Sequence, residues 1–443
     1  MIHRILAWST ALLFAVAPAW GQSAQVPAPP QEQPILLHNT MVHPVADEGP
    51  TVFRGWVLFD GGLITRTGEG EPPTENLPAN TLQINAEGMH LVPGFIAMAT
   101  QVGMVETLQV DATDDRSEAG DQTPEVEPWI AVNPDSDLIP VARSAGILHA
   151  LLTPTSGTIS GRASLVRLDG WTIEDLVVVR DAGLVVQWPL AAPFRAPWMR
   201  RGADEQRSRI AKQLAAIDTY FDDAEAWQAA MAADPTTPGD LRFAALQPVL
   251  AGERPVMIQA NSRGQIESAL AWTNGRGLKP IIVGGAAAAQ CIPSLKAANA
   301  AVVIDGVHRL PMARHDAWDT PFRLAAELHE AGIPFAIAAG DEPAHIRSLP
   351  HQAATAAAHG LPRSEALRAI TRSPAEILGV DGRLGSIEKG RSATFFLCEG
   401  DPLEMSSPPV AAWIDGRGID LGDRQKRFFE KYQEKYRQRK LID

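Results

Sequence analysis

The sequence has only two cysteines among 443 residues, Cys291 and Cys398, which are too few for a disulfide framework. We expect two buried free thiols, with a bridge between them left open. Basic residues are also scarce, because 39 Lys and Arg stand against 52 Asp and Glu. The resulting charge of −13 repels phosphate backbones and argues against nucleic acid as a partner.

Long apolar runs are missing as well. The one candidate, residues 5–17, is shorter than the ~20 residues that a membrane span needs, so no membrane span is expected. With its short basic start and the small residues that follow, it is typical of a signal peptide over residues 1–21. The sequence therefore predicts a periplasmic or secreted protein. Residues 22–34 are rich in Pro, Gln and Ala and are predicted to be a disordered linker.

The remainder of the chain shows two patterns of expected secondary structure. Short β-type runs separated by turns fill residues 35–92 and return after residue 380, whereas strands and helices alternate over residues 93–379. The sequence thus predicts an α/β fold: a (β/α)8 TIM-type barrel at 93–379, inserted in a small β-sandwich built from residues 35–92 and 380–443. The expected barrel strands include residues 148–153, 184–187, 256–260, 280–283, 301–304 and 334–338.

Two helices near the end of the chain carry specific expectations. One is predicted to run without a break over residues 366–378, with Ser364 as its N-cap. The other begins at Asp423 and places Phe428, Tyr432 and Tyr436 four residues apart among Lys and Arg. We expect this aromatic stripe to dock onto its own domain, with binding to a membrane surface as the alternative.

Several motifs resemble those of one family. The segment Gly88-Met-His-Leu-Val-Pro-Gly-Phe-Ile96 resembles the strand and turn that open the barrel of the amidohydrolase superfamily, which includes imidazolonepropionase-like hydrolases. Gly385-Ser-Ile-Glu-Lys-Gly390 and Gly400-Asp-Pro-Leu403 resemble its returning C-terminal strands, and residues 132–135 and 255–266 are similar to an exported subgroup. The resemblance implies the barrel and sandwich described above, a divalent metal such as zinc, a small-molecule substrate and pairing into a homodimer.

The metal-binding positions depart from the family pattern. The resemblance implies an Asp-x-His-x-His motif where this chain has Ala97, Ala99 and Gln101. A histidine of the fifth strand aligns with Gln259, and the sixth strand, residues 281–285, offers glycine in place of another. Methyl groups cannot bind a metal and neutral amides are poor zinc ligands, so no metal ligand is predicted.

One catalytic position of the family is retained, because Asp341 follows the eighth strand where the resemblance implies the acid/base aspartate. Two hypotheses follow. The chain is either an exported hydrolase of non-peptide C–N bonds, such as cyclic amides, with Asp341 as the acid/base, or an inactive relative that binds a small molecule or protein partner. Whether it is an enzyme stays open at this point.

Other polar residues follow the barrel strands, where this fold carries its sites. We predict ligand contacts by Asn261 and Arg263 after the fifth strand and by Asp305, His308 and His345 after the last two strands. The competing interpretation is that these are ordinary surface side chains.

Two further loops are expected at the same end of the barrel. Residues 106–127 hold eight acidic side chains and are predicted to form a solvated loop rather than a site for a cation. Residues 153–162 contain Gly157 and Gly161 but no lysine as in a phosphate-binding loop, so a plain glycine turn is favoured.

Overall fold

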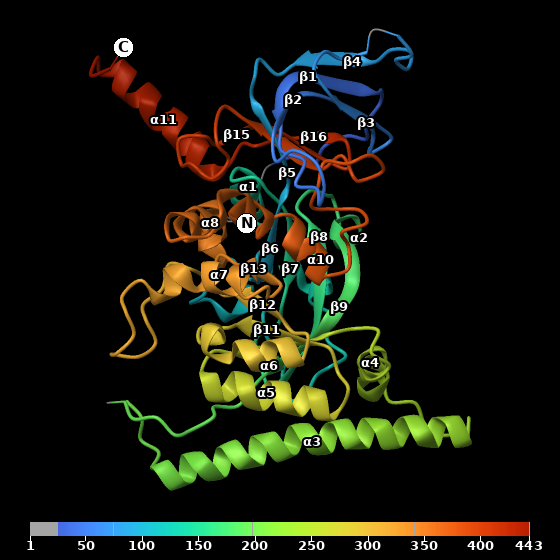
Figure 1. Cartoon of the computed structure of the whole chain (residues 1–443), viewed down its shortest axis with the longest axis vertical. Helices are drawn as coiled ribbons and strands as arrows, with labels where there is room; N and C mark the ends of the chain where they lie inside the picture. Colours follow the sequence, from blue (N-terminus) through green and yellow to red (C-terminus); the bar gives the residue numbers. More distant parts are fainter. Residues whose placement is uncertain (1–24, 74, 197, 341, 443) are drawn as a thin grey trace, which may run out of the picture.

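The computed structural model describes residues 25–442, apart from residues 74, 197 and 341. The predicted signal peptide and Asp341 therefore lie outside the described residues. The described chain forms two eight-stranded sheets (Figure 1): a small sheet built from both ends of the sequence, and a larger sheet wound into a barrel. The predicted α/β architecture, a barrel inserted in a sandwich, is confirmed.

The small sheet joins strands that are about 300 residues apart in the sequence, in the order β16-β15-β14-β5-β1-β2-β3 with β4 paired to β1. Strand β14 from the C-terminal part of the chain pairs antiparallel with β5 from the N-terminal part, with Phe395 opposite Pro93. At the other edge, Ile64 in β3 donates to Arg391 O at 2.8 Å, so the sheet nearly closes on itself. The strands are β1 (Ile35–Val42), β2 (Phe53–Asp60), β3 (Leu63–Glu69), β4 (Leu82–Asn85), β5 (His90–Pro93), β14 (Phe395–Cys398), β15 (Pro409–Ile414) and β16 (Arg417–Ile419).

Aromatic side chains from both ends fill this sandwich. Phe59 meets Phe395 edge-on with ring centroids 5.2 Å apart, and Trp413 lies 6.0 Å from Phe59. Both phenylalanines are fully buried. Because the three rings come from β2, β14 and β15, neither end of the chain can complete this core alone.

The large sheet has the strand order β13-β12-β11-β10-β9-β8-β7-β6. All neighbours are parallel except β8, which runs antiparallel to both β7 and β9. This strand occupies part of the segment predicted as a glycine turn, so that prediction was wrong beyond residue 158. The strands are β6 (Phe95–Thr100), β7 (Ile147–Leu152), β8 (Ile159–Arg167), β9 (Val177–Gln187), β10 (Val256–Ala260), β11 (Pro280–Gly284), β12 (Ala301–Ile304) and β13 (Phe335–Ile337).

The barrel is closed by a loop instead of a strand ladder. Ile96 N of β6 donates to Ile370 O at 2.9 Å, and Ile337 N of β13 donates to Ala369 O at 3.0 Å. Residues 369 and 370 therefore bridge the first and last strands. The predicted helix 366–378 is wrong: the chain forms two helices that are interrupted over these residues and Thr371, and Pro362 stands at the N-cap position instead of Ser364.

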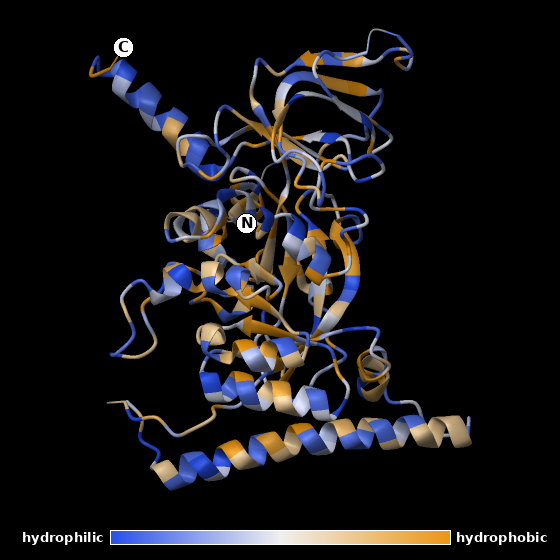
Figure 2. Ribbon diagram, in the orientation of Figure 1, coloured by the Kyte–Doolittle hydropathy of each residue, from blue (hydrophilic) through white to orange (hydrophobic). Residues whose placement is uncertain are grey.

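Apolar side chains fill the barrel and separate its two ends. Leu165, Val185, Met257 and Val303 belong to this interior cluster, and all four are buried. A second, larger cluster packs the outer faces of the strands against the helices, and Figure 2 shows the barrel strands largely in orange between helices of mixed colour. Strands covered on both faces read as short apolar runs, which is why the sequence predicted most of them.

The helices are α1 (Leu138–Arg143), α2 (Ile173–Leu176), α3 (Ala203–Ala233), α4 (Leu241–Leu250), α5 (Arg263–Gly275), α6 (Ile292–Ala297), α7 (Thr320–Glu330), α8 (Leu349–Ala358), α9 (Arg363–Arg368), α10 (Arg372–Ile377) and α11 (Arg424–Gln438). Four short 3-10 helices cover Asp111–Thr113, Pro128–Ala131, Ala288–Cys291 and Pro343–Ser348.

Among the described helices, none is long and apolar enough to cross a bilayer. Cys291 and Cys398 are both buried free thiols.

The prediction of a disordered linker is wrong for residues 25–34. Ala28 N donates to Asp169 Oδ2 at 3.1 Å, and Gly62 N donates to Gln31 Oε1 at 3.0 Å. The segment buries little of its own apolar surface, as its composition predicts, but the folded body supplies hydrogen-bond partners that hold it in an extended path.

Helix α11 does not pack as the sequence predicted. It begins at Asp423, whose carboxylate accepts from Lys426 N at 2.8 Å, as a helix from this residue requires. None of its residues is buried, and Figure 1 shows it projecting away from both sheets. The expected docking of its aromatic stripe onto its own domain is therefore wrong.

Two buried histidines predict acid sensitivity. His43 Nε2 lies 2.8 Å from His90 Nδ1 in the sandwich, and burial, with His90 nearby, lowers the pKa of His43 to about 4. His149 on β7 is also buried, and desolvation lowers its pKa despite the nearby Asp415. Between the unfolded pKa of about 6.5 and the folded value, the unfolded state binds more protons, so stability falls as pH falls.

We expect the free energy of unfolding to drop by about 1.4 kcal/mol per pH unit for each such histidine below pH ~6.5. Urea unfolding at pH 7 and at pH 5.5 measures this slope. His43→Asn should reduce it, and an unchanged slope in that variant would assign the acid sensitivity to other groups.

Candidate binding site at the barrel mouth

The carboxyl ends of the parallel strands meet at one end of the barrel, and side chains from seven of them surround a cavity there, which we call the mouth cavity. Its volume is about 250 Å³. The lining residues are Ala99, Gln101, Arg116, Thr153, Pro154, Thr155, Val185, Gln187, Met257, Gln259, Val283, Asp305 and Glu342. Three amides, two hydroxyls, one guanidinium and two carboxylates therefore face one small space.

The first wall of the cavity is formed where β6 ends. The pairing of β6 with β7 is irregular between Ala97 and Thr100, and Ala99 adopts φ +51°, which favours glycine. Gln101 is only 5% exposed, and its amide nitrogen lies 3.4 Å from both Thr153 O and Thr153 Oγ1. Its amide is thus directed to the neighbouring strand end, leaving its carbonyl oxygen as the acceptor.

The positions aligned with the family's metal ligands come together here, but their chemistry does not fit zinc. Ala99, Gln101 and Gln259 line the cavity and supply a methyl group and two neutral amides. Within residues 25–442, leaving aside the undescribed positions, no group of three or more His, Cys, Asp or Glu side chains is placed to hold a metal ion. We therefore derive no catalytic step through a metal.

The sixth strand shows why a ligand there is disfavoured as well as absent. Gly284 has φ +96°, and a Cβ at this position would lie 2.5 Å from Asn261 Oδ1. The Asn261 side chain thus occupies the space that a larger residue would need, and its Oδ1 lies 3.4 Å from Ala286 N as an acceptor. Its observed contacts hold the ends of β10 and β11 together.

Arg116 is a lining residue that the sequence analysis did not single out. It lies in the acidic loop 106–127, and its guanidinium pairs with Asp114 at 2.7 Å. The loop is tied to the barrel because Thr155 N donates to Arg116 O at 3.0 Å. Arg116 is the single basic residue of that loop, a signal that could have identified it.

The predicted ligand contacts are dispersed. Asp305 lines the mouth cavity directly after β12. Arg263, in the first turn of α5, pairs with Glu267 at 2.8 Å and has a side chain that is 62% exposed. His308 Nε2 lies 2.7 Å from Thr355 Oγ1 outside the cavity lining, and burial lowers its pKa. His345 is exposed on the 3-10 helix after β13. Binding roles for these residues stay predictions.

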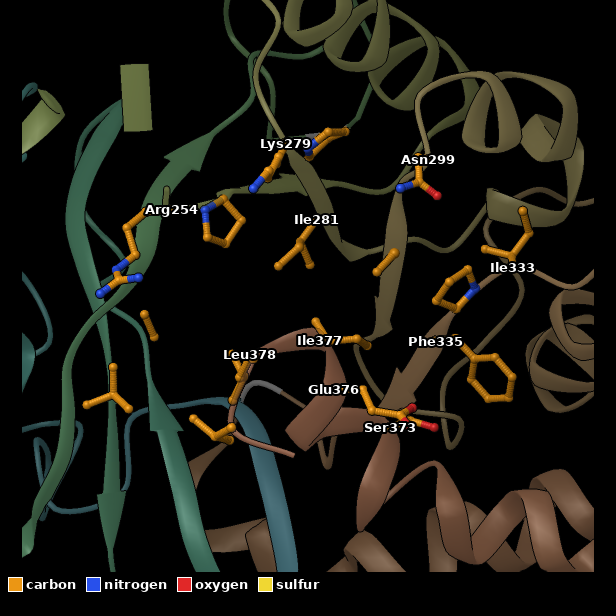
Figure 3. Close-up of a pocket in the computed structure, with 18 of the residues that line it drawn as sticks. Arg254, Lys279, Ile281, Asn299, Ile333, Phe335, Ser373, Glu376, Ile377 and Leu378 are labelled. Carbon is orange, nitrogen blue, oxygen red and sulfur yellow. The ribbon is translucent and has the colours of Figure 1, made fainter. Parts of the chain in front are cut away.

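A larger cavity of about 910 Å³ lies at the opposite end of the barrel (Figure 3). Lys279, Ile281, Asn299 and Phe335 line it from the starts of the strands, and α10 forms another wall. The amino ends of barrel strands serve stability in this fold, whereas sites form at the carboxyl ends. We therefore take the smaller mouth cavity as the candidate site.

Comparisons with known proteins agree with this architecture. A profile of the Amidohydrolase family matches residues 298–422. The amidohydrolase tasK of Hapsidospora irregularis is 24% identical over 434 residues, which cover 87% of this chain and 43% of that protein. These matches support the amidohydrolase superfamily for this chain. This superfamily is typically metal-dependent, so the donor set of the mouth cavity departs from it.

Solved structures show the same fold. An amidohydrolase from Thermotoga maritima MSB8 superposes with a TM-score of 0.73 at 23% identity, covering 87% of this chain and 99% of that one. An adenosine deaminase from Xanthomonas campestris, solved with bound zinc, gives a TM-score of 0.51 at 18% identity over 93% and 100% of the two chains. The chain spans less than half the length of its curated relative tasK.

Proposed function

We propose that the mouth cavity binds a small molecule that carries an amide and a carboxylate, and that it does so without a tightly held zinc ion. The observation that carries the proposal is the lining: Gln101, Gln187 and Gln259 offer amide donors and acceptors beside the Arg116 guanidinium. Amides pair with amides, and a guanidinium attracts a ligand carboxylate although its Nε and Nη2 already bind Asp114. A volume of about 250 Å³ suits a dipeptide-sized or smaller ligand.

Hydrolysis of a C–N bond is the second candidate. Similarity to the superfamily favours it, as does Asp341, which directly precedes the cavity residue Glu342 in the sequence. Without a metal, water must be activated by a carboxylate alone. Metal-bound water has a pKa near 7 against 15.7 in bulk, so a carboxylate forgoes roughly 12 kcal/mol of nucleophile activation. We therefore propose binding first, with turnover absent or very slow.

The test measures the melting temperature of the purified protein with L-alanyl-L-alanine, N-acetyl-L-alanine and a cyclic amide such as dihydrouracil. A ligand that raises it should bind about 10- to 100-fold more weakly to Arg116→Ala, since a charge-assisted hydrogen bond is lost. Arg263→Ala is the matched control, because its guanidinium lies outside the cavity lining and should leave affinity unchanged. Equal losses in both variants would contradict the proposed site.

Two measurements separate binding from catalysis. Elemental analysis of protein purified without chelators should find zinc well below one ion per chain. Asp341→Asn should leave the ligand-induced rise in melting temperature nearly intact. Product formation that disappears in this variant would support hydrolysis instead, and a full zinc complement would overturn the metal-free proposal.

A further inference from the structure

Helix α11 contacts the body of the protein at its start. Its N-cap Asp423 is buried, and Arg424 and Arg427 lie 3.6 and 3.9 Å from Asp137. Beyond this first turn, no residue of the helix is buried, and Figure 1 shows the helix leaving the sandwich and barrel. A helix of 15 residues is marginal in water by itself, so its free faces raise the question of what they contact.

One of these faces is aromatic. Phe428, Tyr432 and Tyr436 are four residues apart and so lie along one side of the helix, with Phe429 at its border. All four side chains are exposed, Phe429 by 66%. Such a contiguous exposed aromatic face on a soluble domain marks an interaction surface.

Basic residues outnumber acidic residues on α11, and both acidic residues lie away from that face. The helix carries six Lys and Arg but only two Glu, in a chain whose overall charge is −13. Glu430 and Glu434 each follow an aromatic residue by two positions, which places them about 200° away, on the opposite side of the helix. Basic side chains flank the aromatic face: Arg424 lies 5.5 Å from the ring centroid of Phe428, and Lys435 lies 5.4 Å from that of Tyr432.

This arrangement fits a flat anionic surface with an apolar layer beneath it. An aromatic face with basic flanks and acidic residues turned away is the pattern of helices that lie in the plane of a membrane interface. Self-pairing of α11 is disfavoured, because it would set two strongly basic helices against each other. We propose that α11 binds the surface of a bilayer containing anionic lipids, with its aromatic face in the headgroup region.

Two loops support a common orientation. The segment after β9 exposes Trp198 by 77%, and the segment after β12 exposes Leu310 by 85% and Trp318 by 70%. In Figure 1 both segments project toward the same side of the molecule as α11. Both also follow the carboxyl ends of barrel strands, so a docked molecule would present the side of the barrel mouth to the lipid.

The test is co-sedimentation of the full chain with vesicles of phosphatidylcholine alone and with about 30% phosphatidylglycerol. Binding should require the anionic lipid and weaken at high salt, since each basic residue near the surface contributes about 1 kcal/mol, or about fivefold. Lys431→Gln/Lys435→Gln should therefore weaken binding by roughly 25-fold. Phe428→Ser/Tyr432→Ser/Tyr436→Ser should weaken it at least tenfold through lost apolar burial.

The matched control is Trp171→Ser, which removes a 65% exposed aromatic two residues before α2. Figure 1 shows α2 on the other side of the molecule from α11. This control variant should leave vesicle binding unchanged. All substituted side chains are exposed, and circular dichroism checks that each variant folds. Absence of binding to anionic vesicles overturns the proposal, and so does a concentration-dependent dimer that the aromatic triple variant abolishes while vesicle binding persists.

Discussion

Replacing Gly284 with histidine is expected to destabilise the protein by about 2–5 kcal/mol and to leave it without a zinc site. The substitution restores the residue type that the superfamily places on this strand. Here, however, the backbone has φ +96°, and the new Cβ would lie 2.5 Å from Asn261 Oδ1. Left-handed backbone costs about 1–2 kcal/mol for a residue with a Cβ, and overpacking adds about 1–3 kcal/mol.

Urea unfolding measures the loss, and elemental analysis measures the metal. The double variant Gly284→His/Asn261→Ala separates the two causes, because it removes the clash but not the backbone strain. It should recover part of the stability and still bind no zinc. A stable single variant that takes up one zinc ion per chain would show that the departure of this site from its family is only a matter of one side chain.

The second large effect is expected at a buried ion pair. Arg143 in α1 and Asp169 after β8 lie 2.5 Å apart, with side chains only 5% and 1% exposed. Asp169→Ala leaves the guanidinium buried without its partner and should lower the free energy of unfolding by about 3–5 kcal/mol. The same carboxylate accepts from Ala28 N, so the extended segment before β1 should loosen as well.

Chemical denaturation and hydrogen exchange at the Ala28 amide measure the two consequences. The control is Asp204→Ala, which breaks the pair between Asp204 and Arg207 on α3, where the side chains are 95% and 60% exposed. Solvent-exposed pairs contribute little, so no measurable shift of the unfolding midpoint is expected. A similarly small effect of Asp169→Ala would mean that water or a rearranged neighbour compensates for the lost carboxylate.

The sequence predicted those parts of the fold that have a strong local signal. Buried parallel strands appear as short apolar runs, so β7 and β9 to β13 were placed within a few residues, apart from the early start of β9 at Val177. The helix from Asp423 was found through the four-residue spacing of its aromatic residues. In contrast, β8 was hidden by Gly157 and Gly161. Gly161 permits a close approach to Val126, because a Cβ there would lie 3.0 Å from the Val126 Cβ.

The failures share a physical origin in contacts between distant segments. Before the interruption at Thr371, residues 369 and 370 give their carbonyls to β13 and β6, and no local pattern records this. The free position of α11 likewise could not be inferred, since an amphipathic stripe indicates a partner surface without saying whether it belongs to the same chain.

The sequence predicted where the candidate site lies better than it predicted which residues line it. Strand ends and the aligned positions Ala99, Gln101 and Gln259 led to the mouth cavity, and Asp305 was named among its residues. Arg116 was missed because the surrounding acidic loop reads as solvated. Arg263 shows the converse difficulty, because a residue three positions past a strand can point along the following helix instead of into the barrel.

The split sandwich has a consequence for how the protein is made. Strand β5 finds its neighbour β14 only after roughly 300 further residues have been translated, which takes about 15–60 s at typical elongation speeds. During this interval the first five strands carry an unpaired edge, which is a template for wrong pairing with other chains. Yield on expression should accordingly depend on holding chaperones that shield this edge until the last strands emerge.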